Sequence, residues 1–137
     1  MLKYFLASKR CLDLILAKDD ANIFRQSLEE LLQGRLSENF IDLQEWGRPD
    51  KRVRLRLILG EDDFIAVGSD GMDMIFDRET CEYAVGKLDK FLKSGEIFPA
   101  ELQSFEIVKS NSKNIKNIMI YMHSEDAYHL GGNRDCA

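Results

Sequence analysis

One segment of the chain, residues 51–59, restricts the fold more than any other because its apolar and basic residues alternate. The odd-numbered residues from 53 on are apolar, namely Val53, Leu55, Leu57 and Leu59. The even-numbered residues from 52 to 56 are basic, namely Arg52, Arg54 and Arg56. Successive side chains of a β-strand point to opposite faces of its sheet. The pattern therefore predicts a strand with one face on a hydrophobic core and the other face in water.

A period of two is found throughout residues 38–76, and it returns after Pro99. Turn compositions such as Gly60-Glu-Asp-Asp63 and Gly68-Ser-Asp-Gly71 separate the predicted strands. Because these turns have the length of hairpin connections, we expect 51–59, 64–67 and 72–76 to pair as an antiparallel meander, with 102–109 and 115–123 as a second hairpin, in an antiparallel sheet of roughly five strands. The segments concerned are 40–46, 51–59, 64–67, 72–76, 102–109 and 115–123.

Two segments have apolar residues at the three-to-four spacing of an amphipathic helix. The first covers roughly residues 20–33, with Ile23 and Phe24 on its apolar stripe. The second starts after Asp77 and runs to Ser94. The expected caps are Asp19 or Asp20 and Gly34 for the first helix, and Asp77 and Gly95 for the second.

The fold class predicted from these elements is α+β, an antiparallel sheet with the helices packed on one face. A chain of 137 residues has the size of one domain, 1–137, and no internal repeat or linker is recognised. Residues 11–18 fit either a helix turn or a buried strand, and we favour a helix. Residues 124–137 are polar and are expected to form a mobile tail.

The composition limits the cellular compartments and the classes of partner that we expect for this chain. The three cysteines are widely spaced, which predicts neither a disulfide framework nor a metal site and favours a cytoplasmic location. No segment has the length of a membrane span or the pattern of a signal peptide, so no membrane partner is expected. A net charge of −5 argues against nucleic acid as the ligand, since binding phosphates requires a surplus of basic residues.

No arrangement of residues predicts catalysis, a cofactor or a metal. The two histidines, His123 and His129, lie near the C-terminus, and with Glu125 and Asp126 they follow no established ligand spacing. The sequence around Ser69 lacks the spacing of a nucleophile elbow. We therefore expect a protein that is not an enzyme.

The most distinctive feature is a run of eight acidic residues with Arg78 as its one base: Glu61, Asp62, Asp63, Asp70, Asp73, Asp77, Glu79 and Glu82. Two interpretations remain open. The acids could serve turns, helix caps and cross-strand pairs with the arginines of 52–56. Alternatively, they form a surface that attracts a basic protein partner. The residues predicted to bind that partner are Glu61, Asp62, Asp63, Asp70, Asp73 and Asp77.

The acid-rich strand Ser69-Asp-Gly-Met-Asp-Met-Ile-Phe-Asp77 and the lysine-bearing helix after it resemble small acidic immunity proteins of bacterial toxin systems, including contact-dependent growth inhibition. The resemblance covers residues 38–123 as an order of elements and transfers no functional residue. It implies a cytoplasmic inhibitor that binds a cognate toxin, often a nuclease, and blocks its active site. The acids would then face the basic groove of the toxin.

Two other classes of function fit the sequence. One is a small ligand-binding domain or enzyme with an anion pocket near Arg52 or Arg54. The other is a homodimeric structural protein that pairs through an edge strand.

Overall fold

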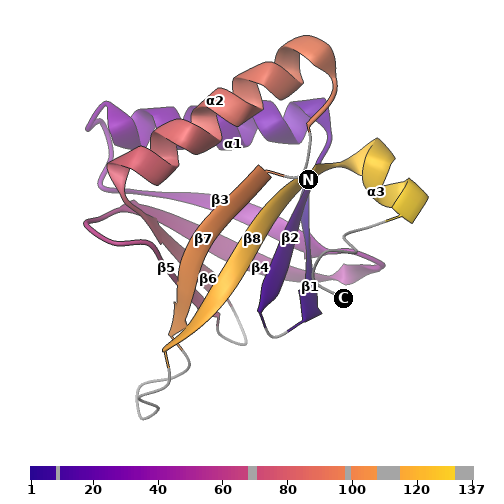
Figure 1. Cartoon of the computed structure of the whole chain (residues 1–137), viewed down its shortest axis with the longest axis horizontal. Coiled ribbons are helices and arrows are strands. Elements are labelled where there is room, and N and C mark those ends of the chain that lie inside the picture. The colour runs from indigo at the N-terminus through magenta and orange to yellow at the C-terminus, as the bar shows by residue number, and fades with distance from the viewer. Residues whose placement is uncertain (9, 68–70, 98–99, 108–114, 132–137) are drawn as a thin grey trace.

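The computed structural model describes residues 1–8, 10–67, 71–97, 100–107 and 115–131. Eight strands close into a barrel in the order β1-β2-β8-β7-β5-β6-β4-β3, and two of the three helices lie side by side over one end of it (Figure 1). Along the chain the elements are β1 (Leu2–Ser8), β2 (Cys11–Leu16), α1 (Lys18–Leu32), β3 (Glu38–Glu45), β4 (Arg48–Leu59), β5 (Phe64–Val67), β6 (Gly71–Phe76), α2 (Arg78–Ser94), β7 (Ala100–Ile107), β8 (Ile115–Ser124) and α3 (Glu125–Gly131).

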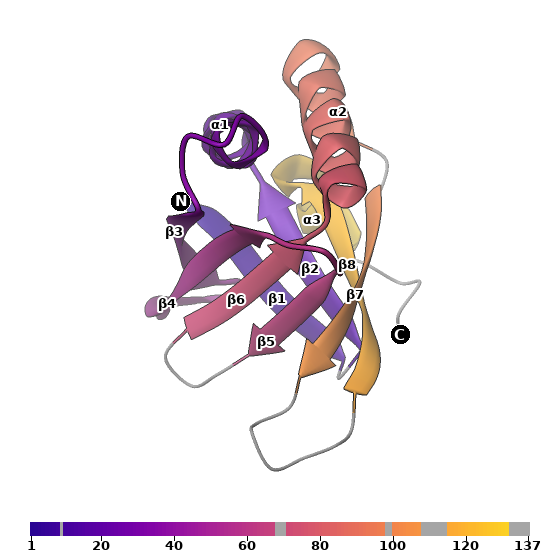
Figure 2. The ribbon, with the colours of Figure 1, turned by 90° about the vertical axis from the view of Figure 1, so that its left-hand side faces the viewer.

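The sheet is mixed, so the prediction of an antiparallel sheet of about five strands is wrong. Four antiparallel hairpins are present, β1–β2, β3–β4, β5–β6 and β7–β8. Each hairpin joins the next through a parallel pair, namely β1–β3, β2–β8, β4–β6 and β5–β7. The helices cover an end of the barrel and not a face of an open sheet (Figure 2). The structure does contain both helices and strands, which agrees with the α+β part of the prediction.

The turn at residues 60–63 shows why the predicted topology failed. We expected it to join β4 and β5 as a hairpin, yet β6 lies between these two strands (Figure 2). β4 pairs with β6 in parallel, and β5 pairs with the other edge of β6. A turn composition indicates where the chain bends, but it does not indicate which strands become neighbours. The hairpins β5–β6 and β7–β8 were predicted correctly.

Residues 11–16, for which we favoured a helix, form strand β2. Every residue of this strand is buried. Its inward residues contact the barrel core, and α3 covers part of its outward face. A strand buried on both faces has no polar alternation, which explains why the sequence pattern was ambiguous here.

The barrel is built from two structurally equivalent halves. The order hairpin, helix, hairpin occurs twice, and exchanging β1, β2, α1, β3 and β4 for β5, β6, α2, β7 and β8 leaves the strand order around the barrel unchanged. Asp13 and Asp73 occupy matching places 60 residues apart, as do Leu28 and Leu88. The expectation of no internal repeat is therefore wrong at the level of structure, because the halves share an apolar pattern more than they share identities.

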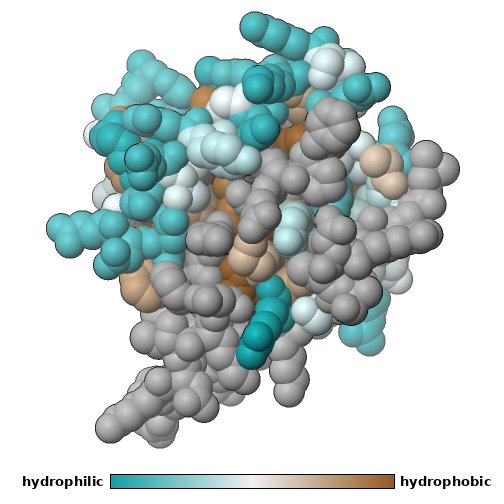
Figure 3. All heavy atoms as spheres, viewed as in Figure 1, coloured by the Kyte–Doolittle hydropathy of each residue, from teal (hydrophilic) through white to brown (hydrophobic). Residues whose placement is uncertain are grey.

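The two long helices match the predicted segments, with one change of cap. Gly34 has the positive φ of 72° expected after α1, but the N-cap is Ala17 and neither Asp19 nor Asp20. Both caps of α2 are confirmed, since the Asp77 side chain accepts from the Thr80 N–H and Gly95 adopts φ 76°. Hydrophilic side chains gather over the outer side of the helices (Figure 3).

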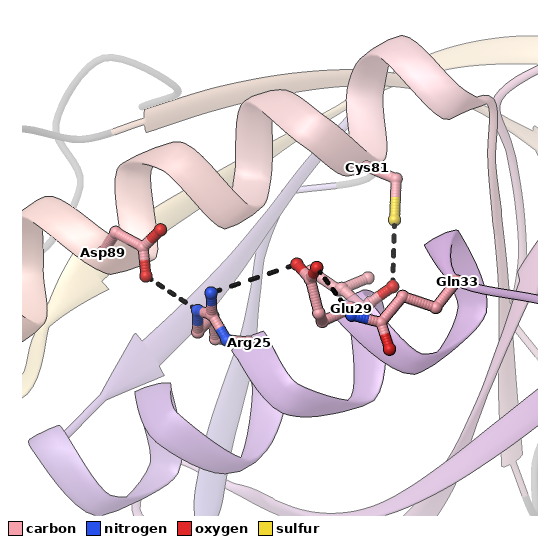
Figure 4. A network of polar contacts seen from close by, with 6 residues as sticks. Arg25, Glu29, Gln33, Cys81 and Asp89 are labelled. Atoms are coloured by element: carbon pink, nitrogen blue, oxygen red, sulfur yellow. Dashed lines mark hydrogen bonds and ion pairs between the residues drawn. The ribbon is translucent and has the colours of Figure 1, made fainter. Parts of the chain in front are cut away.

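A polar network joins the two helices above the apolar core. Arg25 Nε donates to Asp89 Oδ1 at 2.7 Å, and its guanidinium lies 3.9 Å from Glu29 of the same helix (Figure 4). Beside this network the thiol of Cys81 points to the carbonyl oxygen of Leu28, at 3.7 Å. Beneath it, Phe24 and Leu88 are fully buried. The helices therefore close this end of the barrel with an apolar layer.

The predicted tail from residue 124 is also corrected in part. Residues Glu125–Gly131 form α3, and Tyr128 of this helix is buried with 8% of its surface exposed. Residues 132–137 lie outside the described part of the chain. Its buried Tyr128 donates to Asp13, more than one hundred residues earlier in the chain, and local sequence patterns do not indicate such a contact.

Candidate functional site

The six acids predicted to bind a partner do not share one environment. Asp63 and Asp77 serve the start of α2, because Asp63 Oδ1 accepts from the Asp77 N–H at 2.7 Å and Oδ2 accepts from the Thr80 hydroxyl at 2.6 Å. Asp73 forms an ion pair with Arg56, at 3.1 Å. Asp70 lies outside the described residues. Glu61 and Asp62 are exposed in the turn before β5.

Asp63 nevertheless positions the remaining acids. Its two hydrogen bonds hold the turn at residues 60–63 against the first turn of α2, where Glu79 and Glu82 are exposed. We call Glu61, Asp62, Glu79 and Glu82 the acid patch. Arg78 lies within it, and its guanidinium is 3.8 Å from Glu82. Tyr83, with 45% of its surface exposed, follows on the same helix.

Replacing Asp63 with alanine is expected to lower the free energy of unfolding by about 1–2 kcal/mol, because two donors at the start of α2 lose their acceptor. Urea unfolding followed by circular dichroism measures the loss. Asp62→Ala is the matched control, since Asp62 is exposed in the same turn. Equal stability of the two variants would show that Asp63 does not hold the turn.

The arginines of β4 form a row on the outside of the barrel. Arg56 bonds both oxygens of Asp73 and lies 3.3 Å from Glu38, and this hydrogen bonding raises the pKa of Arg56. The Arg54 guanidinium stacks 4.4 Å from the ring centre of Phe40. Arg52 and Arg54 are exposed and neither lines a described cavity. The anion pocket that we considered near them stays a prediction.

A buried polar cluster lies between β2, β8 and α3, and the sequence analysis missed it. Asp13, with no exposed surface, accepts a hydrogen bond from the Tyr128 hydroxyl at 2.7 Å and contacts His123 Nε2 at 3.1 Å. Burial and the bond to Asp13 both raise the pKa of Tyr128. Trp46 packs edge-on against Tyr128, and the Lys3 ammonium lies over the Trp46 ring.

The arrangement of this cluster is that of a structural clamp. His123 has only 4% of its surface exposed, so a substrate has no access to its ring. The hydrogen bond from Tyr128 attaches α3 to Asp13 on the outer face of β2, and the contact with His123 joins the same carboxylate to β8. One feature of the sequence pointed to this cluster: Asp13 is the single charged residue in the apolar run 11–16.

The thiol of Cys81 is also buried, whereas His129 is exposed on α3. Cys81 is a free cysteine, and burial raises its thiol pKa to about 12, which keeps it protonated at neutral pH. No group of three or more metal-ligating side chains was found within the ranges that the structure describes. The expectation that the protein is not an enzyme stays a prediction.

Two of the cavities that described residues line lie at opposite ends of the barrel. The larger, of about 230 Å³, lies where α1 and α3 begin and α2 ends, beside Lys18, Phe91 and Glu125. Glu125 is already bonded to Lys3. The smaller, of about 100 Å³, opens at the hairpin end, between Tyr4, Lys51 and Met72.

Comparison with other proteins identifies no relative. No family model matches the sequence, and neither a curated protein nor a solved structure is significantly similar to it. Among the described helices, none combines the length and the apolar composition required to cross a bilayer. A function must therefore be argued from the acid patch, the clamp and the cavities themselves.

Proposed function

We propose that this chain is a non-enzymatic protein-binding domain, an immunity protein that binds a cognate toxin and covers its basic surface. The observation that carries the proposal is the acid patch beside the exposed ring of Tyr83. Four exposed carboxylates lie at the start of α2, with Arg78 as the base among them. Asp63 fixes the turn that bears Glu61 and Asp62, so these charges are presented by a rigid surface.

The two kinds of group have different roles in binding. Exposed carboxylates mainly accelerate association with a basic partner and select against acidic ones. Tyr83 supplies the large, partly exposed ring that is typical of residues with a major share of binding energy. Three of the other predicted residues contribute less, because Asp63 and Asp77 serve the start of α2 and Asp73 is paired with Arg56, while Asp70 lies outside the described residues.

The expected partner is a basic toxin domain, and a nuclease fits best because its nucleic-acid groove must be positively charged. Covering that groove requires no chemistry from the inhibitor, in keeping with the buried state of Cys81 and His123. The cytoplasm of the cell that carries the toxin is the proposed site of action.

Charge reversal of the patch tests the proposal. The partner is first captured from the native cell extract, and it must then inhibit growth when produced alone and lose that effect when produced with this chain. The double variant Glu61→Lys, Asp62→Lys should slow association with it about tenfold at low salt, because attraction becomes repulsion. Stopped-flow kinetics at two salt concentrations measures the rate.

The matched control is Asp42→Lys, Asp50→Lys, which makes the same change of net charge at exposed positions on β3 and β4. Equal slowing by both double variants would mean that net charge acts and the patch does not. A partner that has no toxicity, or whose toxicity this chain leaves unchanged, would refute the immunity function.

A further inference from the structure

The hairpin end of the barrel is incompletely filled. Strands β1, β4 and β6 point Tyr4, Val53 and Met72 into the barrel, and together with Leu6 and Val67 these side chains line the cavity of about 100 Å³. The opposite end is closed by the apolar layer under α1 and α2. The pocket with mainly apolar walls therefore lies at the end of the barrel that α1 and α2 do not cover.

One residue that lines this pocket, Tyr4, carries a polar group without a described partner. Tyr4 has only 3% of its surface exposed, and within the described part of the chain its hydroxyl has no hydrogen-bond partner. Burial raises the pKa of this hydroxyl, so it remains a neutral donor. A buried hydroxyl without a partner costs about 1–3 kcal/mol, so an acceptor that enters the pocket would be stabilised by this donor.

Three charged groups lie near the hydroxyl, one carboxylate and two cations, and they carry one net positive charge. Glu45 is the β3 neighbour of Tyr4, and its carboxylate lies 3.6 Å from the Lys51 ammonium and 3.4 Å from the Arg48 guanidinium. Two cations therefore face one carboxylate at the rim. Lys51 has 48% of its side chain exposed and itself lines the pocket, so its ammonium can turn toward a ligand.

We propose that this pocket binds a small aliphatic monocarboxylate. The tail contacts Val53, Val67 and Met72, while the carboxylate accepts from the Tyr4 hydroxyl and pairs with the Lys51 ammonium. An apolar cavity of about 150 Å³ holds benzene, so 100 Å³ accommodates a tail of about four carbon atoms. Butanoate is the probe with this size and charge.

The pocket differs from the anion site considered near Arg52 and Arg54. Those arginines lie on the outward face of β4, whereas Lys51 lines the interior with Val53. The acid patch lies at the helix end of the barrel, so ligand binding and partner binding are separable. Glu61→Lys, Asp62→Lys is expected to bind butanoate as tightly as the native chain.

A titration with butanoate tests the proposal. Nuclear magnetic resonance follows the chemical shifts of the methyl groups of Met72 and Val67. Saturable shifts of these signals are expected. Tyr4→Phe and Lys51→Met should each raise the dissociation constant about tenfold, since each loses a bond to a charged acceptor. Arg52→Met is the matched control, because it removes the neighbouring cation on the outward face, and it should leave binding unchanged.

Butan-1-ol and butylammonium separate the contribution of charge from that of the apolar tail. Both should bind more weakly than butanoate. The proposal is overturned if either binds as well as butanoate, if Arg52→Met weakens binding as much as Lys51→Met, or if no saturable shift occurs. If Tyr4→Phe fails to fold, the comparison of Lys51→Met with Arg52→Met still tests the proposal. Both of these residues are largely exposed, so we expect both variants to fold.

Discussion

Replacing Asp13 with alanine is expected to lower the free energy of unfolding by about 3–5 kcal/mol. The Asp13 carboxylate is completely buried and bonds both Tyr128 and His123. Without it, two buried polar groups lose their partner, and α3 loses its principal attachment to β2. Urea unfolding measures the change, and hydrogen exchange of the α3 amides should increase more than that of α1.

The internal repeat offers a matched control for this prediction. Asp73 occupies the equivalent place in β6, but its carboxylate is 40% exposed and pairs with Arg56 on the surface. Asp73→Ala should therefore lose only a small fraction of what Asp13→Ala loses, because exposed ion pairs contribute little. Similar losses for both variants would contradict the view that burial makes the Asp13 cluster a clamp. Tyr128→Phe removes one donor and should cost about 1–2 kcal/mol.

The same pair of aspartates shows what the sequence could and could not predict. Asp73 stands in an alternating strand, so its surface position followed from the pattern, and its pairing with an arginine of β4 was one of the two interpretations left open. Asp13 stands in a run that is buried on both faces, and its partners come from β8 and α3, more than one hundred residues further along the chain. Local periodicity carries no information on such contacts.

The topology was beyond prediction for a related reason. Hairpins β5–β6 and β7–β8 are local, and turn composition identified both. The parallel pairs that close the barrel join strands from different hairpins, such as β2 with β8. Those pairings depend on how the two halves pack around one core, and neither half indicates it alone. The unpartnered hydroxyl of Tyr4 was likewise invisible until the barrel was assembled.

The acids show a third limit. Their number and spacing predicted an acidic surface, and part of it is present as the acid patch. The sequence did not separate the acids that cap α2 from those that remain exposed. Asp77 was identified as an N-cap from its place before the helix, but Asp63 reaches the same helix across a turn and strand β6. Capping by residues distant in sequence has no local signature.

Replacing Phe24 with alanine should lower the free energy of unfolding by about 3–5 kcal/mol. Phe24 is completely buried in the apolar layer that closes the barrel, and truncating its ring leaves a large cavity between α1 and the strands. Denaturant unfolding measures the loss. The structure of the α1 backbone should persist, because alanine favours helix.

Ile23, the adjacent residue, is the control for Phe24. The helical spacing placed both residues on one apolar stripe, but Ile23 is 55% exposed whereas Phe24 has no exposed surface. Ile23→Ala should change stability by less than about 0.5 kcal/mol, as surface substitutions usually do. A loss comparable with that of Phe24→Ala would show that Ile23 is covered in solution, which would identify the outer side of α1 as a second contact surface.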